Sequence, residues 1–583
     1  MKPFEDDVLE LISNIKYQRK FNQFQQKLAQ DCQQIKQSRD LIVKSDKTNN
    51  NYRMPVQDYK TMLKQNVTKS YKKTNTQEVF QTNLAAQLAK QLEIDDRIET
   101  LSELPAYVTI KDHKDTFPGR MECRLINPSK TKMGLISKKF LENINHLIRK
   151  ETKLNQWQST IDVLRWFENL EGKQNFKFFK FDIESFYPSI NEELLEKSIT
   201  FAELFTEINE TQKKIIRHSR KTFLFLDGAT WIKKNSPDFD VPMGAYDPEE
   251  ISELVGLFLL HQLKQLIPQT DVGLYRDDGL AIVKASGPEI DRLRKKVICL
   301  FKSNSLNVTI ETNVTKTNFL DVTLDLSTKS FKSYNKPSHI PRYININSCH
   351  PPTILKNLPS MIGKRLSIVS SSEEMFDSEK AVYSEALKSA GFKHDLKYNC
   401  NARCSIDTKS KHRKRKILWF NPPFNIAKQF LNLLDKHFPK SSPLHKIFNR
   451  NNVKVSYSCM PNMNSKIANK NKHLLGDQTI PEEKKCNCRK GVKNCPLNGK
   501  CLTESLVYKA EVATTDQNVN YIGMTSTSFK TRFNNHTASF NHKRDSNTSL
   551  SNFIWQLKEK NQKFDIKWSI LRKAPAFKSE TNK

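Results

Sequence analysis

The chain has 583 residues, and 37% of them are hydrophobic, which is enough to fill several cores and excludes a chain that is disordered throughout. Its 95 lysine and arginine residues exceed its 63 aspartate and glutamate residues, which gives a net charge of +32. This excess favours a polyanionic partner, with nucleic acid as the expected kind, over an ordinary solvated basic surface. No apolar run reaches the roughly 18 residues of a membrane helix, and the first residues lack the apolar core of a signal peptide. We therefore expect an intracellular protein with no membrane partner.

In chain order, changes of composition divide the sequence into successive segments. The first is rich in Gln, Lys and Asn and is expected to be helical, apart from a polar break at Ser45–Asn51. Strands rich in aromatic and β-branched residues then alternate with amphipathic helices, as in an α+β core, before helical periodicity returns. The predicted segments are a helical N-terminal extension over 1–100, an α+β core over 101–330, a helical region over 331–464, a linker over 465–485, a cysteine-rich stretch over 486–505 and an α/β segment over 506–583.

Three aspartates in the α+β core stand next to apolar stretches. The stretch FKFFKFDIESFYPSI predicts a strand that carries Asp182 at its C-terminal end. The stretch LYRDDGLAIV predicts a hairpin that turns at Gly279 and carries Asp277 and Asp278 at its tip. A plain hairpin accounts for the second stretch alone, but a carboxylate at the end of an apolar strand is costly to bury unless it meets solvent or a cation. Two-metal phosphoryl transfer needs carboxylates from separate strands around a pair of cations, so these aspartates form a candidate metal site.

Four of the eleven cysteines fall within the stretch CNCRKGVKNCPLNGKC. They are Cys486, Cys488, Cys495 and Cys501. Their spacing, C-x-C-x6-C-x5-C, suits one tetrahedral zinc ion, and so short a charged segment would need the metal in order to fold. Reduced cysteines without metal are the alternative. An odd total in a reducing compartment disfavours a disulfide framework.

Stretches of the α+β core resemble motifs A, B and C of reverse transcriptases, in that order. They are FDIESFYPSI from Phe181, PMGAYDPEEISELVGLFLL from Pro242 and YRDDG from Tyr275. The stretches KDHK and CRLINPSK resemble the segment that holds the incoming triphosphate, and NFLDVTLDL resembles the strand that leads into the thumb. The tract PSHIPRYININSCHPPTILKNLPSMIGKRLS, at Pro337–Ser367, resembles the Penelope-like retroelement reverse transcriptases in particular.

The resemblance implies a right-hand polymerase, with fingers and palm over 101–330 and a helical thumb and connection over 331–464. It implies that Asp182 and Asp277 bind two Mg²⁺ or Mn²⁺ ions and that Asp278 is a third catalytic carboxylate supporting them. The residues implied to contact the substrate are Lys111, Lys114 and Arg124 for the triphosphate, Tyr187 beneath the sugar 2′ position and Gly244 beside the template-paired nucleotide. A core tyrosine and a plain turn are the alternatives for the last two.

The last segment resembles a GIY-YIG endonuclease domain through the stretches LVYKAEV, NYIGMTSTSFKTRFNNH and LSNFIWQLKEK. The residues that this implies are Tyr508 and Tyr521 of a paired-strand core, Gly523 in the turn after Tyr521, and Arg532 and His536 on one helix face as a phosphate-binding and acid/base pair. A surface helix with ordinary core tyrosines is the alternative. Such nucleases also need a metal-binding glutamate, for which Glu580 is the only late candidate. We therefore expect an incomplete nuclease with weak or absent cleavage that can still bind DNA.

Taken together, the patterns predict an RNA-directed DNA polymerase of a Penelope-like retrotransposon, which extends a DNA 3′-hydroxyl on an RNA template. Its expected partners are the RNA template, a DNA primer or target, and deoxynucleoside triphosphates; the sequence does not fix the oligomeric state. One alternative is an RNA-templated RNA polymerase, against which Tyr187 argues. Another is a non-enzymatic nucleic-acid-binding protein, against which the clustered carboxylates argue. The basic run KHRKRK, at Lys411–Lys416, is either a nuclear localisation signal, as a nuclear protein would need, or a phosphate-binding or solvated surface.

Overall fold

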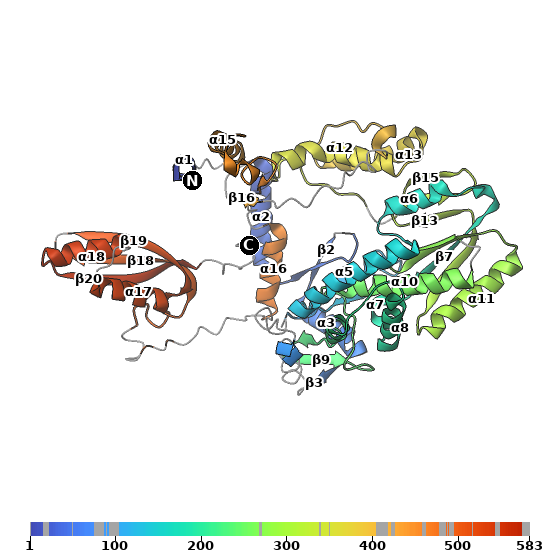
Figure 1. Cartoon of the computed structure of the whole chain (residues 1–583), viewed down its shortest axis with the longest axis horizontal. Helices are drawn as coiled ribbons and strands as arrows, with labels where there is room; N and C mark the ends of the chain where they lie inside the picture. The colour runs from blue at the N-terminus through green and yellow to red at the C-terminus, as the bar shows by residue number, and fades with distance from the viewer. Residues whose placement is uncertain are drawn as a thin grey trace. The chain divides into compact units, whose positions relative to one another are not determined.

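The computed structural model describes residues 2–14, 22–48, 50–74, 87–88, 90–91, 104–267, 271–336, 340–348, 350–403, 418–420, 426–456, 462–476, 486, 488, 495–515, 517–542 and 548–573. The chain divides into two compact units, Met1–Leu474 and Leu475–Lys583, which are described separately (Figure 1). Both units combine helices with sheets, so the α+β class expected from the sequence is confirmed.

A five-stranded sheet lies in the first unit, in the order β12-β7-β11-β10-β6. Its strands are β6 (Asn155–Gln156), β7 (Lys177–Ile183), β10 (Asp271–Tyr275), β11 (Asp278–Val283) and β12 (Val308–Val314). Neighbouring strands are antiparallel except β10 and β6, which are parallel. Successive side chains of β7 point to opposite faces, so Phe179 and Phe181 lie in one hydrophobic core and Phe178 lies in another.

Helices supply the core on the Phe179 face of the sheet (Figure 1). They include α5 (Lys132–Thr152), α7 (Phe186–Ser189), α8 (Glu192–Glu203), α10 (Pro248–Leu266) and α11 (Gly287–Ser303), with α9 (Glu210–His218) beside α5. Apolar side chains surround α10 on most sides, and its Leu254, Leu257 and Leu260 are fully buried. Such a helix is stable only inside a core, which is why α10 is packed between α5, α8 and the sheet.

The Phe178 face of the sheet is covered by a second core that continues into the following chain. It contains α6 (Thr160–Asn169), the sheet β13 (Lys316–Phe319), β14 (Val322–Asp325) and β15 (Ser330–Ser333), and the helices α12 (Pro352–Ile368) and α13 (Glu373–Ser389). Short 3-10 helices lie at Lys173–Asn175, Cys400–Ala402 and Pro443–Lys446. The central strands β7, β10 and β11 are therefore largely buried on both sides.

The N-terminal region contains more strand than the helical extension predicted from the sequence. Its helices are α1 (Lys2–Ser13), α2 (Gln23–Gln37) and α3 (Val56–Ser70), and its strands are β1 (Leu41–Lys44), β2 (Asn51–Met54) and β3 (Tyr71–Thr74). The polar break predicted at Ser45–Asn51 is the turn between β1 and β2. Strand β3 pairs with β9 (Ala229–Lys233), next to β8 (Leu224–Leu226), and β4 (Tyr107–Ile110) pairs with β5 (Cys123–Ile126).

The linker predicted at 465–485 starts with a helix instead. The elements before the boundary of the unit are β16 (Leu418–Phe420), α15 (Ala427–His437), β17 (Val453–Val455) and α16 (Met463–Leu474). Helix α16 contacts α2 and β1, and the Asn471 side chain hydrogen-bonds the backbone of Ile42 at both its amide and its carbonyl. Tertiary contacts thus order a segment whose polar composition indicates a linker. The run KHRKRK lies outside the described residues.

The second unit is built on a three-stranded antiparallel sheet in the order β19-β18-β20. Its elements are β18 (Glu504–Thr514), β19 (Asn518–Ser528), α17 (Phe529–Asn541), α18 (Ser549–Glu559) and β20 (Phe564–Lys573). The cysteine-rich stretch is not a separate body, because Leu497 packs in one cluster with Tyr508 of β18 and Phe529 of α17. The Lys530 amide also donates to the Cys501 carbonyl at 2.7 Å.

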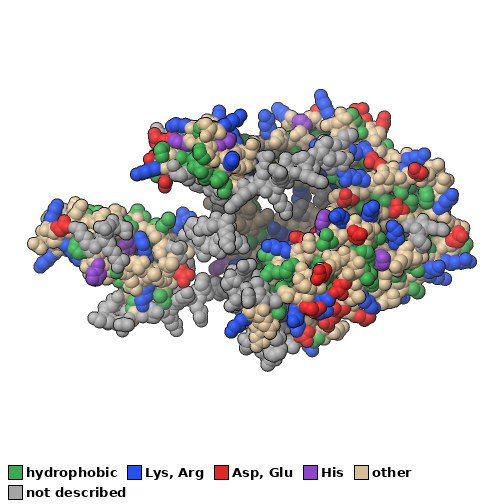
Figure 2. Space-filling model, viewed as in Figure 1, with side chains coloured by type: hydrophobic (Ala, Val, Ile, Leu, Met, Phe, Trp, Pro, Cys, Tyr) green, Lys and Arg blue, Asp and Glu red, His purple; other side chains and the backbone are tan. Residues whose placement is uncertain are grey.

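Basic side chains are spread over the first unit. Figure 2 shows Lys and Arg side chains across its visible face, with acidic side chains interspersed and most numerous on the lower part of that face. Among the described residues, no helix combines the length and apolar character needed to cross a membrane.

Candidate active site

The three predicted aspartates meet at one end of the five-stranded sheet. Asp182, near the end of β7, and Asp278, the first residue of β11, are directly opposite each other in the antiparallel register. Opposed residues have Cα atoms about 4.5–5.5 Å apart and side chains on the same face. The Ile183 amide donates to the carbonyl of Asp277 at 2.9 Å, so the turn before β11 is fixed against β7. Carboxylates separated by some ninety residues in sequence therefore share one strand end.

The hairpin turns earlier than the sequence indicated. Tyr275 pairs with Asp278, which leaves Arg276 and Asp277 as the two turn residues, and Arg276 has the positive φ of 56°. Gly279, predicted to make the turn, instead lies in β11, where a Cβ atom would stand 2.0 Å from the ring of Phe181. Glycine is required there by close packing and not by the backbone angle. Arg276 is held by an ion pair with Glu249 at the start of α10.

Like charges and burial perturb the carboxylates. Burial, followed by the charges of Asp277 and Asp182, raises the pKa of Asp278 to about 6. Burial and the charge of Asp277 also raise the pKa of Asp182. Carboxyl groups that disfavour each other's ionisation are stabilised by a shared cation, so this donor set fits divalent metal ions. The oxygen atoms of the three carboxylates are not all within 4.8 Å of one another. Among the described residues, that close spacing of ligand atoms is found for Cys486, Cys488, Cys495 and Cys501 of the second unit.

The residues expected to hold a triphosphate lie on and beside the β4–β5 hairpin. Arg124 is on β5, and its Nε lies 3.2 Å from Asp46 Oδ1 in an ion pair. Lys111 follows β4, and its amide donates to the Glu122 carbonyl at 2.8 Å. Lys114 is exposed in the turn that follows. The hairpin thus presents several cations from one small region, and an ion pair with Asp46 holds Arg124 in place.

Tyr187 and Gly244 lie where close packing constrains them. Tyr187 is half-buried against the first core, and burial raises its pKa; the charges of Arg276, Glu249 and Asp277 also act on it. Tyr187 also hydrogen-bonds the side chain of Ser252 in α10, the helix whose Glu249 pairs with Arg276 of the carboxylate turn. Gly244 has a φ of +118°, and a Cβ atom there would stand 2.8 Å from the Asn127 carbonyl oxygen. The close neighbour of this glycine is the backbone after β5, so the loop before α10 is locked to that hairpin.

Two further lysines act electrostatically on the carboxylates. Lys180 lies two residues before Asp182, on the same face of β7, and its Nζ donates to the Asn318 carbonyl at 3.0 Å. The charges of Lys180 and Lys47 act to lower the pKa of both Asp182 and Asp278. Strand periodicity could have placed Lys180 in the site, and Lys47 lies in the stretch KSDKTNNNY, which resembles a family signature usually written Asp-Lys-Gly, with Thr48 in place of the glycine.

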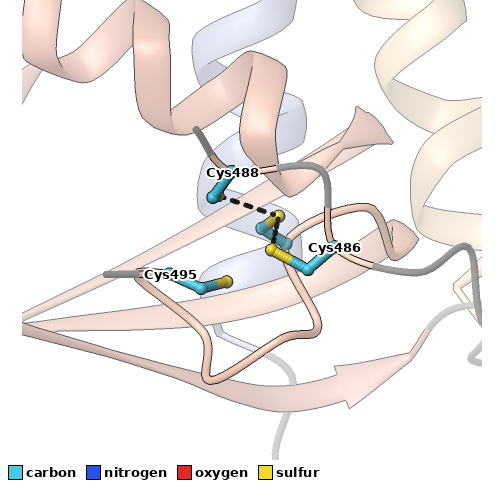
Figure 3. Close-up of side chains that lie close together, drawn as sticks. Cys486, Cys488 and Cys495 are labelled. Carbon is cyan, nitrogen blue, oxygen red and sulfur yellow. Dashed lines mark hydrogen bonds between the residues drawn. The ribbon is translucent and has the colours of Figure 1, made fainter. Parts of the chain in front are cut away.

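The four cysteines converge in the second unit (Figure 3). Cys501 Sγ lies 3.6 Å from Cys486 Sγ and 3.7 Å from Cys488 Sγ. Four thiolates at about 2.3 Å from a tetrahedral zinc ion are separated by about 3.8 Å, which is close to these distances. Cys495 and Cys501 are buried. The arrangement fits one zinc ion held by all four sulfurs.

The nuclease candidates also come together. The Tyr508 hydroxyl lies 2.7 Å from His536 Nε2 and accepts a hydrogen bond from Arg532 Nε at 3.1 Å. The ring of Tyr521 packs 5.9 Å from that of His536. Burial, followed by the charge of Arg532, lowers the pKa of His536 to about 4. The imidazole is therefore neutral at pH 7, which favours a base over an acid at this position.

Gly523 does not make a turn, contrary to the expectation from the sequence. It lies within β19 opposite Tyr508, and a Cβ atom would stand 2.5 Å from the Tyr508 ring. Glycine is needed to leave room for the tyrosine that binds Arg532 and His536. Glu580, the late candidate for a metal ligand, lies outside the described residues.

No protein-family model and no curated protein matches the chain. Solved structures resemble parts of it. Telomerase from Candida albicans, in complex with a TWJ fragment of telomeric RNA, has 11% identity and a TM-score of 0.43, with 71% of this chain and 74% of that chain covered. Apo telomerase from Candida tropicalis has 12% identity and a TM-score of 0.41, with 67% and 75% covered.

Other similar structures are matched over a smaller share of their length. The chain spans 63% of apo telomerase from Candida tropicalis truncated from its C-terminal domain, at 10% identity and a TM-score of 0.37, with 50% of this chain covered. It spans 34% of the BmCPV RNA-dependent RNA polymerase at elongation state, at 11% identity and a TM-score of 0.34, with 59% of this chain covered. These structures are all nucleic-acid polymerases, but at such scores the likeness does not assign the chain to their families.

Proposed function

We propose that the first unit is a template-directed polymerase, and specifically an RNA-directed DNA polymerase of the Penelope-like kind. The observation that carries the proposal is the convergence of Asp182, Asp277 and Asp278 at one strand end, with raised pKa values at Asp182 and Asp278. A module that only binds nucleic acid gains nothing from carboxylates that repel phosphate. The net charge of +32 supports a polyanionic partner, and we infer an RNA template and a DNA primer.

Each residue has a distinct part in the proposed reaction. Asp182 and Asp277 would hold two divalent cations, with Asp278 supporting them, and bound cations of this kind activate the attacking 3′-hydroxyl and stabilise the pyrophosphate leaving group. Arg124, with Lys111 and Lys114 near it, would neutralise the triphosphate. Phosphoryl transfer is catalysed chiefly by such positioning and charge neutralisation, which suits a site of rigid strand ends and surrounding cations.

Tyr187 supports deoxynucleotides as substrates. Its ring is fixed against the first core beside the turn that carries Asp277. A rigid aromatic ring beneath the sugar would exclude a 2′-hydroxyl by steric clash, which is a form of selection against the wrong substrate. An RNA-templated RNA polymerase would have to leave that space open.

Primer extension tests the proposal. Wild-type protein with Mg²⁺ is expected to extend oligo(dT) on poly(rA) with dTTP, and Asp277→Ala is expected to lose about a thousandfold or more of the rate, because metal binding contributes several kcal/mol to the transition state. Asp325→Ala, which removes a carboxylate at the end of β14 that has no part in the proposed site, is the matched control and should retain activity. Equal extension by wild type and Asp277→Ala would refute the polymerase assignment. Better use of UTP than of dTTP would favour the RNA polymerase.

We also propose that the second unit is a zinc-stabilised, GIY-YIG-like domain that binds DNA. The Tyr508–Arg532–His536 contacts support a phosphate site, because Arg532 is oriented by the tyrosine hydroxyl while its terminal nitrogens can meet a phosphate. Glu580, the late candidate for a metal ligand, lies outside the described residues, and we expect DNA binding with weak or absent cleavage. Nicking of supercoiled plasmid by the wild-type chain, lost in Arg532→Ala, would contradict that expectation. A protein acting on chromosomal DNA would work in the nucleus.

A further inference from the structure

The turn between β1 and β2 is attached to the hairpin that carries the candidate triphosphate-binding residues. Ser45 forms a parallel bridge with Ile110 of β4, and the Asp46 amide donates to the Ile110 carbonyl at 2.8 Å. Leu41 and Val43 of β1 are buried. An N-terminal segment far away in sequence is therefore a fixed neighbour of the β4–β5 hairpin.

The buried side chain of Asp112 holds this turn in one shape. Its Oδ2 accepts hydrogen bonds from Tyr52 Oη at 2.8 Å and from Asn50 Nδ2 at 3.0 Å. The Thr48 hydroxyl donates to the same oxygen. The ring of Tyr52 packs edge-on against Phe117, with 5.3 Å between the ring centroids. A carboxylate with this many donors restricts the turn residues that follow Lys47 to a single arrangement.

Asp46 connects the turn to Arg124. Its side chain is 9% exposed and pairs with Arg124 Nε at 3.2 Å, whereas the Arg124 side chain is 35% exposed. The ion pair uses Nε, so the two terminal nitrogens of the guanidinium can still bind a second anion in bidentate fashion. Asp46 therefore orients Arg124 without occupying the part of the guanidinium that binds phosphate.

Lys47 is exposed and lies in this turn between Asp46, which pairs with Arg124, and Thr48, which hydrogen-bonds Asp112. Lys336, which follows β15, has its pKa lowered by burial and then by the charge of Lys47. Burial followed by Lys47 also lowers the pKa of His113. Lys47 thus directly follows the residue that orients Arg124, and cations gathered in this way suit a bound polyanion.

We propose that this turn is part of the nucleotide site: Lys47 contacts the triphosphate of the incoming nucleotide, and Asp46 is the positioning residue for Arg124. The inference rests on the proposed polymerase function and adds to it a contact from the N-terminal hairpin. It also gives that hairpin a role that its distance in sequence from the three aspartates conceals.

Equilibrium binding of dTTP tests the role of Lys47 without chemistry. The full chain is bound to poly(rA) with a dideoxy-terminated oligo(dT) primer in Mg²⁺, and dTTP is titrated while the resistance of the complex to a competitor duplex is measured. Lys47→Ala is expected to raise the Kd for dTTP roughly 10- to 100-fold, as loss of a charge-assisted hydrogen bond would. Lys47→Arg should recover most of the affinity. Lys44→Ala, which removes an exposed lysine of β1 three residues away, is the matched control and should bind as wild type does.

Steady-state extension separates the possible outcomes. Lys47→Ala should raise the KM for dTTP more than it lowers kcat, while Asp46→Asn and Arg124→Ala should be non-additive, as expected for residues acting on one group. Wild-type affinity for dTTP in Lys47→Ala, with an altered Mg²⁺ requirement, would mean that Lys47 serves only the carboxylates and would overturn the inference. Additive effects of Asp46→Asn and Arg124→Ala would overturn the positioning role. If the wild-type chain extends no primer at all, the polymerase proposal itself fails.

Discussion

Replacing Asp278 with asparagine is expected to stabilise the protein at neutral pH in the absence of magnesium. Burial, with the charges of Asp277 and Asp182, raises the pKa of Asp278 from 3.8 to about 6. The folded protein therefore binds a proton at this carboxyl more tightly than the unfolded chain does. The contribution of this group to stability is complete below about pH 4 and is lost as the pH rises to about 6. Asparagine does not ionise, so only the wild type is destabilised as the pH rises through this window.

The size of the effect follows from the shift. A pKa change from 3.8 to about 6 corresponds to roughly 3 kcal/mol in the free energy of unfolding. For a unit of this size, that is about 3 °C in Tm. Thermal melts followed by circular dichroism, in buffer without added magnesium, should place the Tm of Asp278→Asn above that of wild type at pH 7.5 and level with it at pH 4. Added Mg²⁺ should raise the Tm of wild type more than that of the variant at pH 7.5, because the ion binds the ionised folded site.

Asp325→Asn is the matched control for this prediction. Burial would raise the pKa of Asp325, but hydrogen bonds from Ser327 and the Thr328 amide outweigh it, and the pKa is lowered overall. Its replacement should therefore destabilise the protein at neutral pH. An Asp278→Asn variant that is no more stable at pH 7.5, or equally stabilised at every pH, would refute the account of repelling, buried carboxylates.

Three further outcomes are expected. Gly279→Ala should lower the free energy of unfolding by about 1–3 kcal/mol and impair primer extension, because the added Cβ atom would stand 2.0 Å from the Phe181 ring. Gly287→Ala, whose Cβ atom would meet nothing within 4 Å, is the control and should fold and extend normally. Equal Tm values for the two variants would show that the contact with Phe181 does not matter. Tyr187→Ala should raise incorporation of ribonucleotides relative to deoxynucleotides by roughly tenfold or more in competition assays, and an unchanged ratio would exclude a role in sugar selection. Wild-type protein should contain one equivalent of zinc per chain in elemental analysis, and Cys495→Ser should contain less and should lower the Tm of the second unit. The same zinc content in the variant as in the wild type would contradict a four-cysteine site.

The convergence of the three aspartates could be predicted because it depends on short-range rules. Side chains alternate along a strand, and β7 places Phe178, Lys180 and Asp182 on one face, apolar within the sheet and polar at its end. Strand β11 repeats this order in the opposite direction from Asp278. A charged residue at the end of an apolar strand is therefore informative even before its partner is known.

The roles of glycines could not be predicted in the same way. Gly279 and Gly523 both follow patterns typical of turns, yet each lies within a strand beneath an aromatic ring, of Phe181 and Tyr508 respectively. A sequence shows which residue lacks a side chain, but not which distant ring occupies the space. The positive φ of the carboxylate hairpin falls on Arg276, a residue with no sequence preference for it.

The N-terminal hairpin was missed because its strands depend on their neighbours. Strands β1 and β2 have four residues each, too few to establish an alternating pattern, and they lie in a region rich in helix-forming residues. They are stabilised by pairing with each other and by contacts with β4 and α16. The same contacts order α16 in the predicted linker and fix the turn that carries Lys47, so all three features are tertiary in origin.

The central claim, that Asp182 and Asp277 hold divalent cations for catalysis, is tested most directly by anomalous diffraction. Crystals of the chain with primer, template, dTTP and Mn²⁺ are expected to give two manganese peaks about 4 Å apart, each contacted by these carboxylates. Their absence from crystals of Asp182→Asn grown in the same way would complete the test. Manganese bound only at other residues, with an ordered dTTP and no metal at either aspartate, would contradict the account.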